Sequence, residues 1–574
     1  MKTSLASRIK GAIALRLMRK AVSQKKTDAF LKAAENRSMA ELLLEMDPLH
    51  LYCMHRALLK RCEEVQSSVL LELVRANAHT AFGKEHHFSK IRTVEDFRRE
   101  VPISEWSDYS SRIEELANGA SDLLFAGRTQ YFARTTGTTG AVKLLPISER
   151  ELAPRMLVGR IKNLERSVAC GALPAFLDKK MKIMNLSGTF SVESTEGGVP
   201  IGSASGISAK IEEEADSAEG MVAHPPSLFN YFEDDAYYHV AMRCGLYYRN
   251  MGAVFSTNAK RFENMICYAR EHGEELIEEI RTGTCRYELP EKVREAMREV
   301  LLPNPVRAEE LRRVHAEGRL IPAYYWPELI ACFFWLSGSI GAYAESLRPY
   351  LARDVLFMDC GYGASEANIN VPMEPETPSG ALTIYTYFFE FLPRDGGAPL
   401  LAHELETGKD YELLLTTNAG LYRYRIHDII HVDGFFGTTP MIHFRAKAGD
   451  VANLSGEKLD GPLLQEMIRK AVSDRFGTKA LQVYPDMAER RYVIYIEPDR
   501  DVEREEGLSE LVDDYLLRNV SMYAWARGDA IKKPKVCLMS RGWGEEVYRQ
   551  YAKKGQERAQ IKIPVIRGDA WKPD

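Results

Sequence analysis

A run of threonines and glycines that ends in a lysine has the composition of a phosphate-binding loop. The stretch ARTTGTTGAVKLLP covers residues 133–146. A Walker A loop has the pattern G-x-x-x-x-G-K-[ST] and is followed by a helix, whose N-terminus completes the phosphate site. Here the spacing is Gly137, Gly140 and Lys143, and Leu144 stands where the magnesium-binding hydroxyl would be. This spacing excludes an ordinary P-loop.

The residues on either side of this loop have the pattern of β-strands. We expect strands over 129–134 and 143–147, and Ser148 with Glu151 predicts the start of a helix over about 149–168. A Gly/Thr loop between two strands offers backbone N–H groups and hydroxyls that can hold an anion without a helix dipole. A flexible linker without a ligand has the same composition, so the loop alone leaves both interpretations open.

A second segment joins an apolar strand to a carboxylate. In DVLFMDCGYGASEANINVP (354–372), the strand pattern runs through Gly361 and Gly363 to Glu366. A carboxylate just past a glycine-rich strand end can reach a bound metal ion. A turn that carries a surface glutamate has the same pattern.

A third segment places charges inside a strand pattern. GLYRYRIHDIIHVDGF (420–435) is apolar and aromatic except where Arg423, Arg425 and Asp428 interrupt it. Charged residues in such a strand either lie at an exposed edge or serve a site. The segment by itself does not distinguish the two.

Taken together, these three segments resemble, in order and spacing, the nucleotide-binding motifs of the adenylate-forming enzymes. Within that superfamily the chain is most similar to the Gretchen Hagen family of acyl-acid amido synthetases. The likeness spans roughly residues 60–565. It is carried by the loop at 135–143, YGASE at 362–366 and LYRYRIHD at 421–428, and by the passages at 76–104, YYWPEL (324–329), FEFLP (389–393) and GLYRYR (420–425).

The resemblance implies a site for ATP and Mg²⁺. Tyr362 would stack on adenine, Glu366 would hold Mg²⁺, and Asp428 would accept hydrogen bonds from the ribose hydroxyls, with Arg425 fixing the same region. The loop would embrace the β- and γ-phosphates, which leave as pyrophosphate. The loop residues implied are Thr136, Gly137, Thr138, Thr139, Gly140 and Lys143, and the adenine segment also includes Gly363, Ala364 and Ser365.

The resemblance implies two further lysines and an acyl pocket. Lys458, in NLSGEKLDG, and Lys562, in RAQIKIPVIR, would approach the nucleotide from a rotating small domain, although exposed lysines without a role would look the same. For the acyl pocket we expect a helix around Trp326–Tyr343 as a wall, and a buried core is the alternative for its aromatic residues. The substrate candidates in this segment are Trp335, Ser337 and Tyr343.

The chain departs from the family pattern in three places. His427 replaces the glycine of the usual YRVGD, and Lys447 stands where a hinge-region arginine is common. Ala141 and Val142 replace loop residues that are often Pro, Gly or Glu. None of these changes removes a group that the chemistry needs. The general base stays unassigned, with His427 and His431 as candidates by position.

The elements that would position these residues form two domains. The predicted fold class is α/β, mixed α+β: a large N-terminal domain of layered sheets and helices with a β-barrel-like part, and a small mobile α+β C-terminal domain, as the resemblance to adenylate-forming enzymes implies. Helical patterns cover 28–78 and much of about 226–315. We expect a basic amphipathic helix over 1–27, the large domain over 28–435, a hinge at 436–447 and the small domain over 448–574.

The basic N-terminal segment has three possible explanations. A helix packed on the body with a solvated basic face is the simplest one, and attachment to a membrane surface or an organellar transit peptide are the alternatives.

The overall composition limits the classes of partner. With 574 residues and a net charge of −5 the chain reads as a globular protein of two or more domains and not as a general nucleic-acid binder. Nine scattered cysteines never form C-x-x-C, which favours a reducing cytoplasm. We also expect no membrane-spanning helix. The resemblance, and not the composition, implies that the partners are a small-molecule carboxylic acid and an amine or amino acid.

The resemblance implies a two-step ligase. A carboxylate and MgATP would form an acyl-adenylate and pyrophosphate, and an amine would then displace AMP to form an amide. An acyl-CoA or acyl-carrier thioester synthetase would share the first step, and a non-catalytic homologue would bind nucleotide without releasing pyrophosphate.

Overall fold

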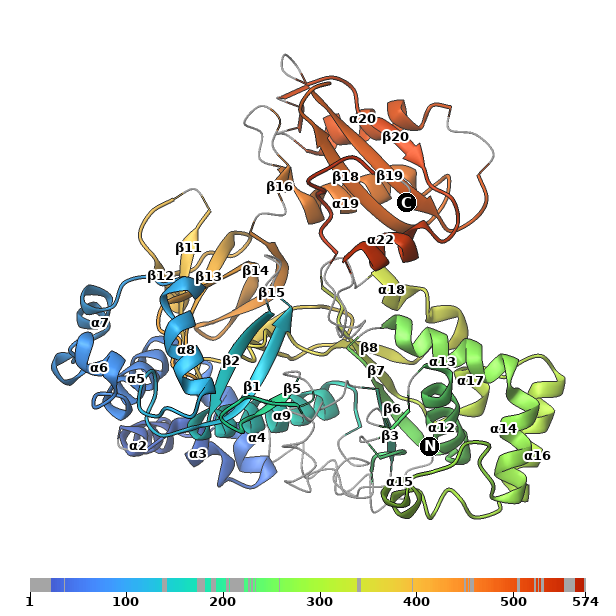
Figure 1. Cartoon of the computed structure of the whole chain (residues 1–574), viewed down its shortest axis with the longest axis horizontal. Helices are drawn as coiled ribbons and strands as arrows, with labels where there is room; N and C mark the ends of the chain where they lie inside the picture. The colour runs from blue at the N-terminus through green and yellow to red at the C-terminus, as the bar shows by residue number, and fades with distance from the viewer. Residues whose placement is uncertain are drawn as a thin grey trace. The chain divides into compact units, whose positions relative to one another are not determined.

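The chain divides into two compact units in a computed structural model. The first unit comprises Met1–Ile426 with Ile430–Phe444, and the second comprises His427–Ile429 with Arg445–Asp574. Figure 1 labels the helices and strands. The residues that the structure describes are 22–35, 37–136, 142–172, 181–186, 193–202, 206, 221–225, 228, 231–232, 234–257, 259–337, 342–394, 396–448, 451–452, 454, 459–502, 506–520, 523–524, 526–527, 531–551 and 563–571.

Short helices form the first part of the first unit, as the apolar spacing over 28–78 predicts. Asp47 begins one of them, because its carboxylate accepts hydrogen bonds from the N–H groups of Leu49 and His50 at 3.1 and 3.2 Å. The expected N-terminal helix over 1–27 lies mostly outside the described residues. The helices are α2 (Gln24–Ala34), α3 (Met39–Leu44), α4 (Pro48–Leu58), α5 (Cys62–Ala76), α6 (Ala81–Glu85), α7 (Val94–Glu100) and α8 (Ser110–Ala117).

The predicted hairpin and helix around the Gly/Thr loop are confirmed. Strands β1 (Thr129–Thr136) and β2 (Val142–Ser148) pair in antiparallel fashion, and helix α9 (Glu149–Ala169) follows directly. Ser148 caps the helix by accepting a hydrogen bond from the Glu151 N–H at 3.2 Å. The sheet order is β2-β1-β5-β4, with β4 (Glu193–Ser194) and β5 (Pro200–Gly202).

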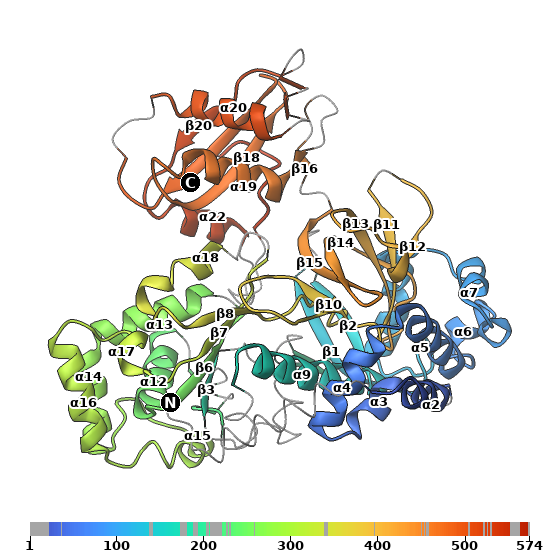
Figure 2. The ribbon, with the colours of Figure 1, turned by 180° about the vertical axis from the view of Figure 1, so that it is seen from behind.

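A parallel sheet of order β3-β6-β7-β8 follows, with helices α12 and α13 beside it in both views (Figures 1 and 2). The helix expected around Trp326–Tyr343 is wrong, because its centre is strand β7. A strand covered on both faces is apolar throughout, so it shows no period that separates it from a buried helix. The strands are β3 (Lys182–Asn185), β6 (Met251–Phe255), which also interrupts the expected helical region, β7 (Ala331–Phe334) and β8 (Leu356–Asp359).

A group of helices packs beside this parallel sheet and shares one hydrophobic core with it. Trp326, 1% exposed, stacks on Phe262 with ring centroids 6.1 Å apart and donates a hydrogen bond to the Gly245 carbonyl at 2.9 Å. The helices are α12 (Asp234–Tyr247), α13 (Ala259–Glu271), α14 (Gly273–Thr282), α15 (Glu291–Ala296), α16 (Pro305–Ala316), α17 (Pro322–Tyr325) and α18 (Ala342–Glu345).

A seven-stranded sheet completes the first unit, in the order β12-β11-β13-β14-β15-β10-β9. It carries the strand pattern predicted for 420–435, although β14 begins at Tyr424 and not at Gly420. The strands are β9 (Asn370–Pro372), β10 (Gly380–Leu382), β11 (Phe388–Pro393), β12 (Leu400–Leu401), β13 (Asp410–Thr416), β14 (Tyr424–Phe436) and β15 (Thr439–Lys447).

The second unit has the predicted alternation of short strands and helices. Its main sheet has the order β18-β19-β20, with β19 antiparallel to β18 and parallel to β20. The two units separate between Phe444 and Arg445, and the hinge at 436–447 stays a prediction. The elements are β16 (Val451–Ala452), β17 (Leu459–Asp460), α19 (Gly461–Val472), β18 (Thr478–Asp486), β19 (Arg491–Pro498), α20 (Leu508–Asn519), β20 (Lys535–Leu538) and α22 (Trp543–Tyr551).

Candidate functional site

The hairpin β1–β2 delivers Lys143 to the loop end. Lys143 pairs with Thr135 in the strand register, and its Nζ lies 5.1 Å from the centroid of the Trp106 ring. Of the other predicted loop residues, Thr136 ends β1. Gly137, Thr138, Thr139 and Gly140 lie outside the described residues.

The segment after β8 folds back on itself and presents Glu366. The N–H of Tyr362 donates to the Asn370 Oδ1 at 2.7 Å, and the N–H of Ile369 donates to the Tyr362 carbonyl at 2.9 Å. Two further backbone hydrogen bonds join Ala364 and Ala367, at 2.9 and 3.2 Å. These bonds close a tight turn whose tip is Ser365–Glu366.

Tyr362 is buried, and the four residues that follow it are half-buried. The Tyr362 side chain is 4% exposed, and its ring centroid is 5.4 Å from that of Phe444. Gly363, Ala364, Ser365 and Glu366 are all half-buried. Within the first unit, Tyr362 therefore sits at the border of the core and the turn carries the more accessible positions.

Three basic side chains of α9 lie against this segment, and none of them belongs to the predicted site. Arg155, Lys162 and Arg166 are spaced by seven and four residues, which places them on one face of the helix. The Arg155 Nη2 donates to the Ser365 carbonyl at 2.9 Å, and the Arg166 Nη2 donates to the Cys360 carbonyl at 2.7 Å. The spacing of three basic residues on one face of an otherwise packed helix was the available signal.

Gly361 lies directly beside the end of the Lys162 side chain. Its φ of +86° is in the left-handed region, and a Cβ built there would lie 2.5 Å from the Lys162 Nζ. Its carbonyl accepts a hydrogen bond from the Trp335 Nε1 at 3.3 Å. The left-handed backbone favours glycine here, and a larger residue would also have to displace the end of the Lys162 side chain.

Two buried carboxylates neutralise part of this positive charge. Burial raises the pKa of Asp359 to about 6, against the lowering effect of hydrogen bonds from the Leu336 and Gly361 N–H groups and of the Lys162 charge. Burial likewise raises the pKa of Glu151 to about 7. The Glu151 Oε1 lies 3.2 Å from the Arg155 Nε.

The predicted acyl-pocket residues are only partly described. Trp335 follows β7 and reaches the Gly361 carbonyl, so it lies beside the segment that carries Tyr362. Ser337 is half-buried two residues further on, and Tyr343 belongs to α18, with its side chain outside the described residues.

The start of β14 is held by ion pairs inside the protein. Arg423, 6% exposed, donates hydrogen bonds to both carboxylate oxygens of Glu390 at 2.8 and 3.1 Å. Arg425 donates to both oxygens of Glu412 at 2.6 and 2.8 Å, and these bonds raise the pKa of Arg425. Arg425 thus has carboxylate partners of its own, and a role toward a nucleotide stays a prediction.

The remaining predicted residues of this motif lie in β14 or outside the described residues. Asp428 is fully buried in the strand. The His431 Nδ1 lies 2.6 Å from the Asp410 Oδ1, and no residue of this strand is assigned as the general base. Lys458 and Lys562 lie outside the described residues, and Lys447 is described only as the last residue of β15.

The backbone conformation of His427 explains why histidine can replace glycine at this position. Its φ is +58°, in the left-handed region where the family pattern has glycine, and its carbonyl accepts a hydrogen bond from the Ala448 N–H at 2.7 Å. Histidine tolerates this region better than most residues, whereas a β-branched side chain is a clear outlier there. His427 therefore occupies a backbone conformation that glycine adopts readily.

We expect His427→Gly to fold with a free energy of unfolding within about 0.5 kcal/mol of the wild type, because relief of the left-handed backbone offsets the added freedom of the unfolded chain. His427→Val should lose about 1–2 kcal/mol. Urea unfolding of both variants measures the difference. Equal stability of the two variants would contradict a left-handed residue at this position.

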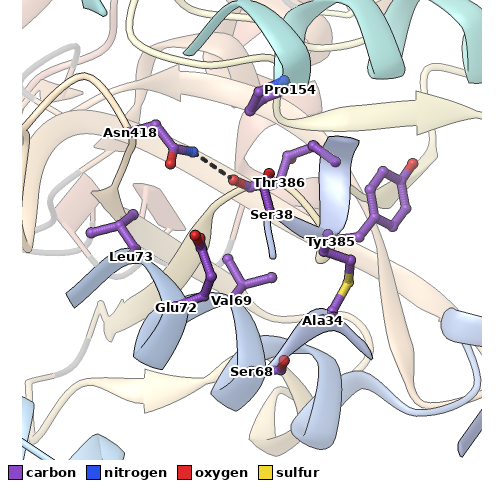
Figure 3. Close-up of a pocket in the computed structure, with 12 residues that line it drawn as sticks. Ala34, Ser38, Ser68, Val69, Glu72, Leu73, Pro154, Tyr385, Thr386 and Asn418 are labelled. Atoms are coloured by element: carbon purple, nitrogen blue, oxygen red, sulfur yellow. Dashed lines mark hydrogen bonds between the residues drawn. The ribbon is translucent and has the colours of Figure 1, made fainter. Parts of the chain in front are cut away.

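A small cavity lies elsewhere in the first unit, between α3, α5 and α9 (Figure 3). Its volume is about 10 Å³, which is room for about one water molecule. Ser68, Glu72 and Asn418 are among the residues that line it, and the Asn418 side chain donates to the Thr386 carbonyl at 3.3 Å. None of the predicted site residues lines this cavity, so its size and lining indicate a structural water site and not a substrate pocket.

The described residues fit a Mg²⁺ ion that is held together with phosphates. No group of three His, Cys, Asp or Glu side chains comes together as a metal site within the described part of the chain. Mg²⁺ usually binds through one or two carboxylates and substrate phosphates, and not in an all-protein cage. A single half-buried carboxylate at a turn tip, such as Glu366, fits that mode.

Within the part of the chain that the structure describes, no helix has the length and apolar character needed to cross a membrane.

Comparison with known proteins identifies the family. The GH3 (Gretchen Hagen) family N-terminal, central and C-terminal domains match residues 55–356, 380–447 and 466–570. This chain belongs to the GH3 family, as the sequence motifs predict.

Individual relatives agree with this assignment. The chain is 26% identical over 543 residues to the probable indole-3-acetic acid-amido synthetase GH3.1 of Arabidopsis thaliana, covering 88% of this chain and 89% of the relative. It is 24% identical to the jasmonoyl–L-amino acid synthetase GH3.5 of Oryza sativa subsp. japonica, and the match covers 87% of this chain and 91% of that relative.

The fold agrees as well. The AtGH3.15 acyl acid amido synthetase in complex with 2,4-DB superposes with a TM-score of 0.79 at 20% identity, over 92% of this chain and 95% of that chain. The predicted mixed α/β fold is therefore confirmed.

Proposed function

We propose that this chain is an ATP-dependent acyl-acid amido synthetase that joins a carboxylic acid to an amino acid. The match to three consecutive GH3 domains carries this proposal. A relative named a probable amido synthetase and one named a jasmonoyl–L-amino acid synthetase each align with nearly nine-tenths of the chain, so the alignments include both units.

The chemistry requires two steps. A carboxylate is a poor electrophile, so it attacks the α-phosphorus of ATP and forms an acyl-adenylate as pyrophosphate leaves. The amino group of the second substrate then attacks the acyl carbon, and the bond to AMP breaks. The amine gives up a proton in this step, and the residue that accepts it stays unassigned.

The described residues support distinct roles in the first step. Lys143 brings a positive charge to the end of the hairpin loop, where it would neutralise the phosphates. Mg²⁺, when bound, would stabilise charge that develops on the phosphate oxygens, and Glu366 is the residue that would hold it. Arg155 fixes the carbonyl of Ser365 and thereby the turn that carries Glu366.

For the remaining positions the proposal rests on the family resemblance. Tyr362 would line the adenine site and Asp428 would bind the ribose, while Lys458 and Lys562 would act from the second unit. We propose that residues 436–447 form the hinge about which that unit turns between the two steps. Trp335 is the described candidate for the wall of the acyl site.

The test is carboxylate-dependent ATP–pyrophosphate exchange with a panel of aromatic, fatty and amino acids. We expect exchange with one class of acid and, on addition of an amino acid mixture, an amide product identified by mass. A thioester formed with coenzyme A instead of an amide would favour thioester synthesis. ATP binding without exchange for any acid would contradict the proposal.

A further inference from the structure

The segment Ser104–Trp106 joins two of the nucleotide motifs although it belongs to neither. The Ser104 N–H donates a hydrogen bond to the Arg423 carbonyl at 3.1 Å, and the Arg425 N–H donates to the Ser104 carbonyl at 2.9 Å. These bonds form a parallel bridge between Ser104 and Tyr424. The segment is thus attached to the start of β14.

Buried hydroxyl groups hold this attachment in one geometry. The Ser104 Oγ donates to the Tyr422 carbonyl at 2.8 Å and lies 2.9 Å from the Tyr109 hydroxyl. The Tyr422 N–H donates to the same Tyr109 hydroxyl at 2.9 Å. Ser104 is 6% exposed and the two tyrosines are fully buried, so the network has little access to water.

The next two residues reach in different directions along the site. The Glu105 Oε1 lies 3.7 Å from the Arg425 Nη1. Trp106 begins the short helix η2 (Trp106–Asp108), and its ring faces the Lys143 ammonium at 5.1 Å. That distance is within the range of a cation–π interaction.

The kind of contact matters for what Lys143 can do. The face of an indole ring attracts a cation without neutralising its charge, so the contact with Trp106 orders the ammonium and leaves its charge in place for phosphate. A lysine side chain has four rotatable bonds, and their ordering on binding opposes affinity. A ring that orders the ammonium before ATP binds lowers this entropic cost of binding.

We propose that Trp106 is a positioning residue for Lys143, held in place by the bridge of Ser104 to β14, and that it prepares the lysine to receive the phosphates of ATP. The inference rests on the proposed function. Trp106 acts through Lys143 and contacts no reacting atom in this assignment.

We expect Trp106→Leu to raise the KM for ATP by about three- to tenfold, because the cation–π contact is lost. The rate at saturating ATP should change by less than about twofold, since the bound phosphates then hold the lysine. Trp106→Phe keeps an aromatic face and should recover most of the affinity. A raised KM together with a lowered kcat, to the same extent in Trp106→Leu and Trp106→Phe, would contradict the assignment.

A double-mutant cycle tests whether the effect passes through Lys143. Equilibrium binding of MgATP, without any acid, is measured for the wild type, Trp106→Leu, Lys143→Ala and the double variant. We expect Trp106→Leu to weaken binding in the wild-type background and to have no further effect beside Lys143→Ala. An equal loss in both backgrounds would overturn the proposal.

The design separates this inference from the proposed function. Normal ATP binding with coupling between Trp106 and Lys143, but without exchange for any acid, would leave the positioning role in place and reject the synthetase. Exchange without coupling between Trp106 and Lys143 would support the synthetase and reject the positioning role. A wild type that binds no ATP would overturn both the positioning role and the synthetase. If Trp106→Leu does not fold, Trp106→Gln in the same cycle gives the same comparison.

Discussion

Lys143→Ala is expected to lower acid-dependent ATP–pyrophosphate exchange by about 10²–10³-fold, the usual cost of removing a group that stabilises charge in a transition state. An anionic carboxylate must approach a polyanion, and Lys143 is the described cation at the end of the β1–β2 hairpin. Loss of its ammonium leaves that repulsion uncompensated. Initial rates of exchange at saturating ATP and acid measure the effect.

Two variants control this result. Lys143→Arg keeps the positive charge but replaces the compact ammonium with a planar guanidinium. We expect its exchange rate to lie between those of the wild type and Lys143→Ala. Lys409→Ala removes a lysine that is 57% exposed and pairs with Glu406, and it should leave exchange unchanged. Exchange by Lys143→Ala within about threefold of the wild type would reject a role for this lysine in charge stabilisation.

Glu390→Ala is expected to lower the free energy of unfolding of the first unit by about 3–5 kcal/mol, the usual cost of breaking a buried ion pair by removing one partner. Glu390 is 1% exposed and joins Arg423 to Arg98, whose Nε donates to its Oε1 at 2.8 Å. Without the carboxylate, the guanidinium of Arg423 remains buried beside that of Arg98 with no counter-charge from residue 390. Urea unfolding followed by circular dichroism measures the loss.

A surface glutamate provides the matched comparison. Glu406→Ala removes a carboxylate that is 64% exposed and pairs with Lys409, and it should cost no more than about 0.5 kcal/mol. Glu390→Gln retains hydrogen-bond capacity and should lie between the two. If Glu390→Ala unfolds as the wild type does, the pair with Arg423 has no net role in holding the start of β14.

The sequence by itself determined the local elements and the family. Alternation around the Gly/Thr loop predicted the hairpin of β1 and β2, and the capping pattern at Ser148 predicted α9, because both signals depend on neighbouring residues. The order and spacing of three short motifs predicted an adenylate-forming enzyme, and the passages at 76–104, 324–329, 389–393 and 420–425 predicted the GH3 family.

Only the tertiary structure decided which residues meet. The apolar run at Ala331–Phe334 became a strand, because a segment buried on both faces has no period of its own. Arg155 meets Ser365 across 210 residues of chain. Ser104 meets Tyr422 across 318 residues. Local sequence patterns indicate which face of an element is buried, but they do not indicate which other element covers that face. Contacts between residues so far apart in the sequence are therefore set by the packing of the whole unit.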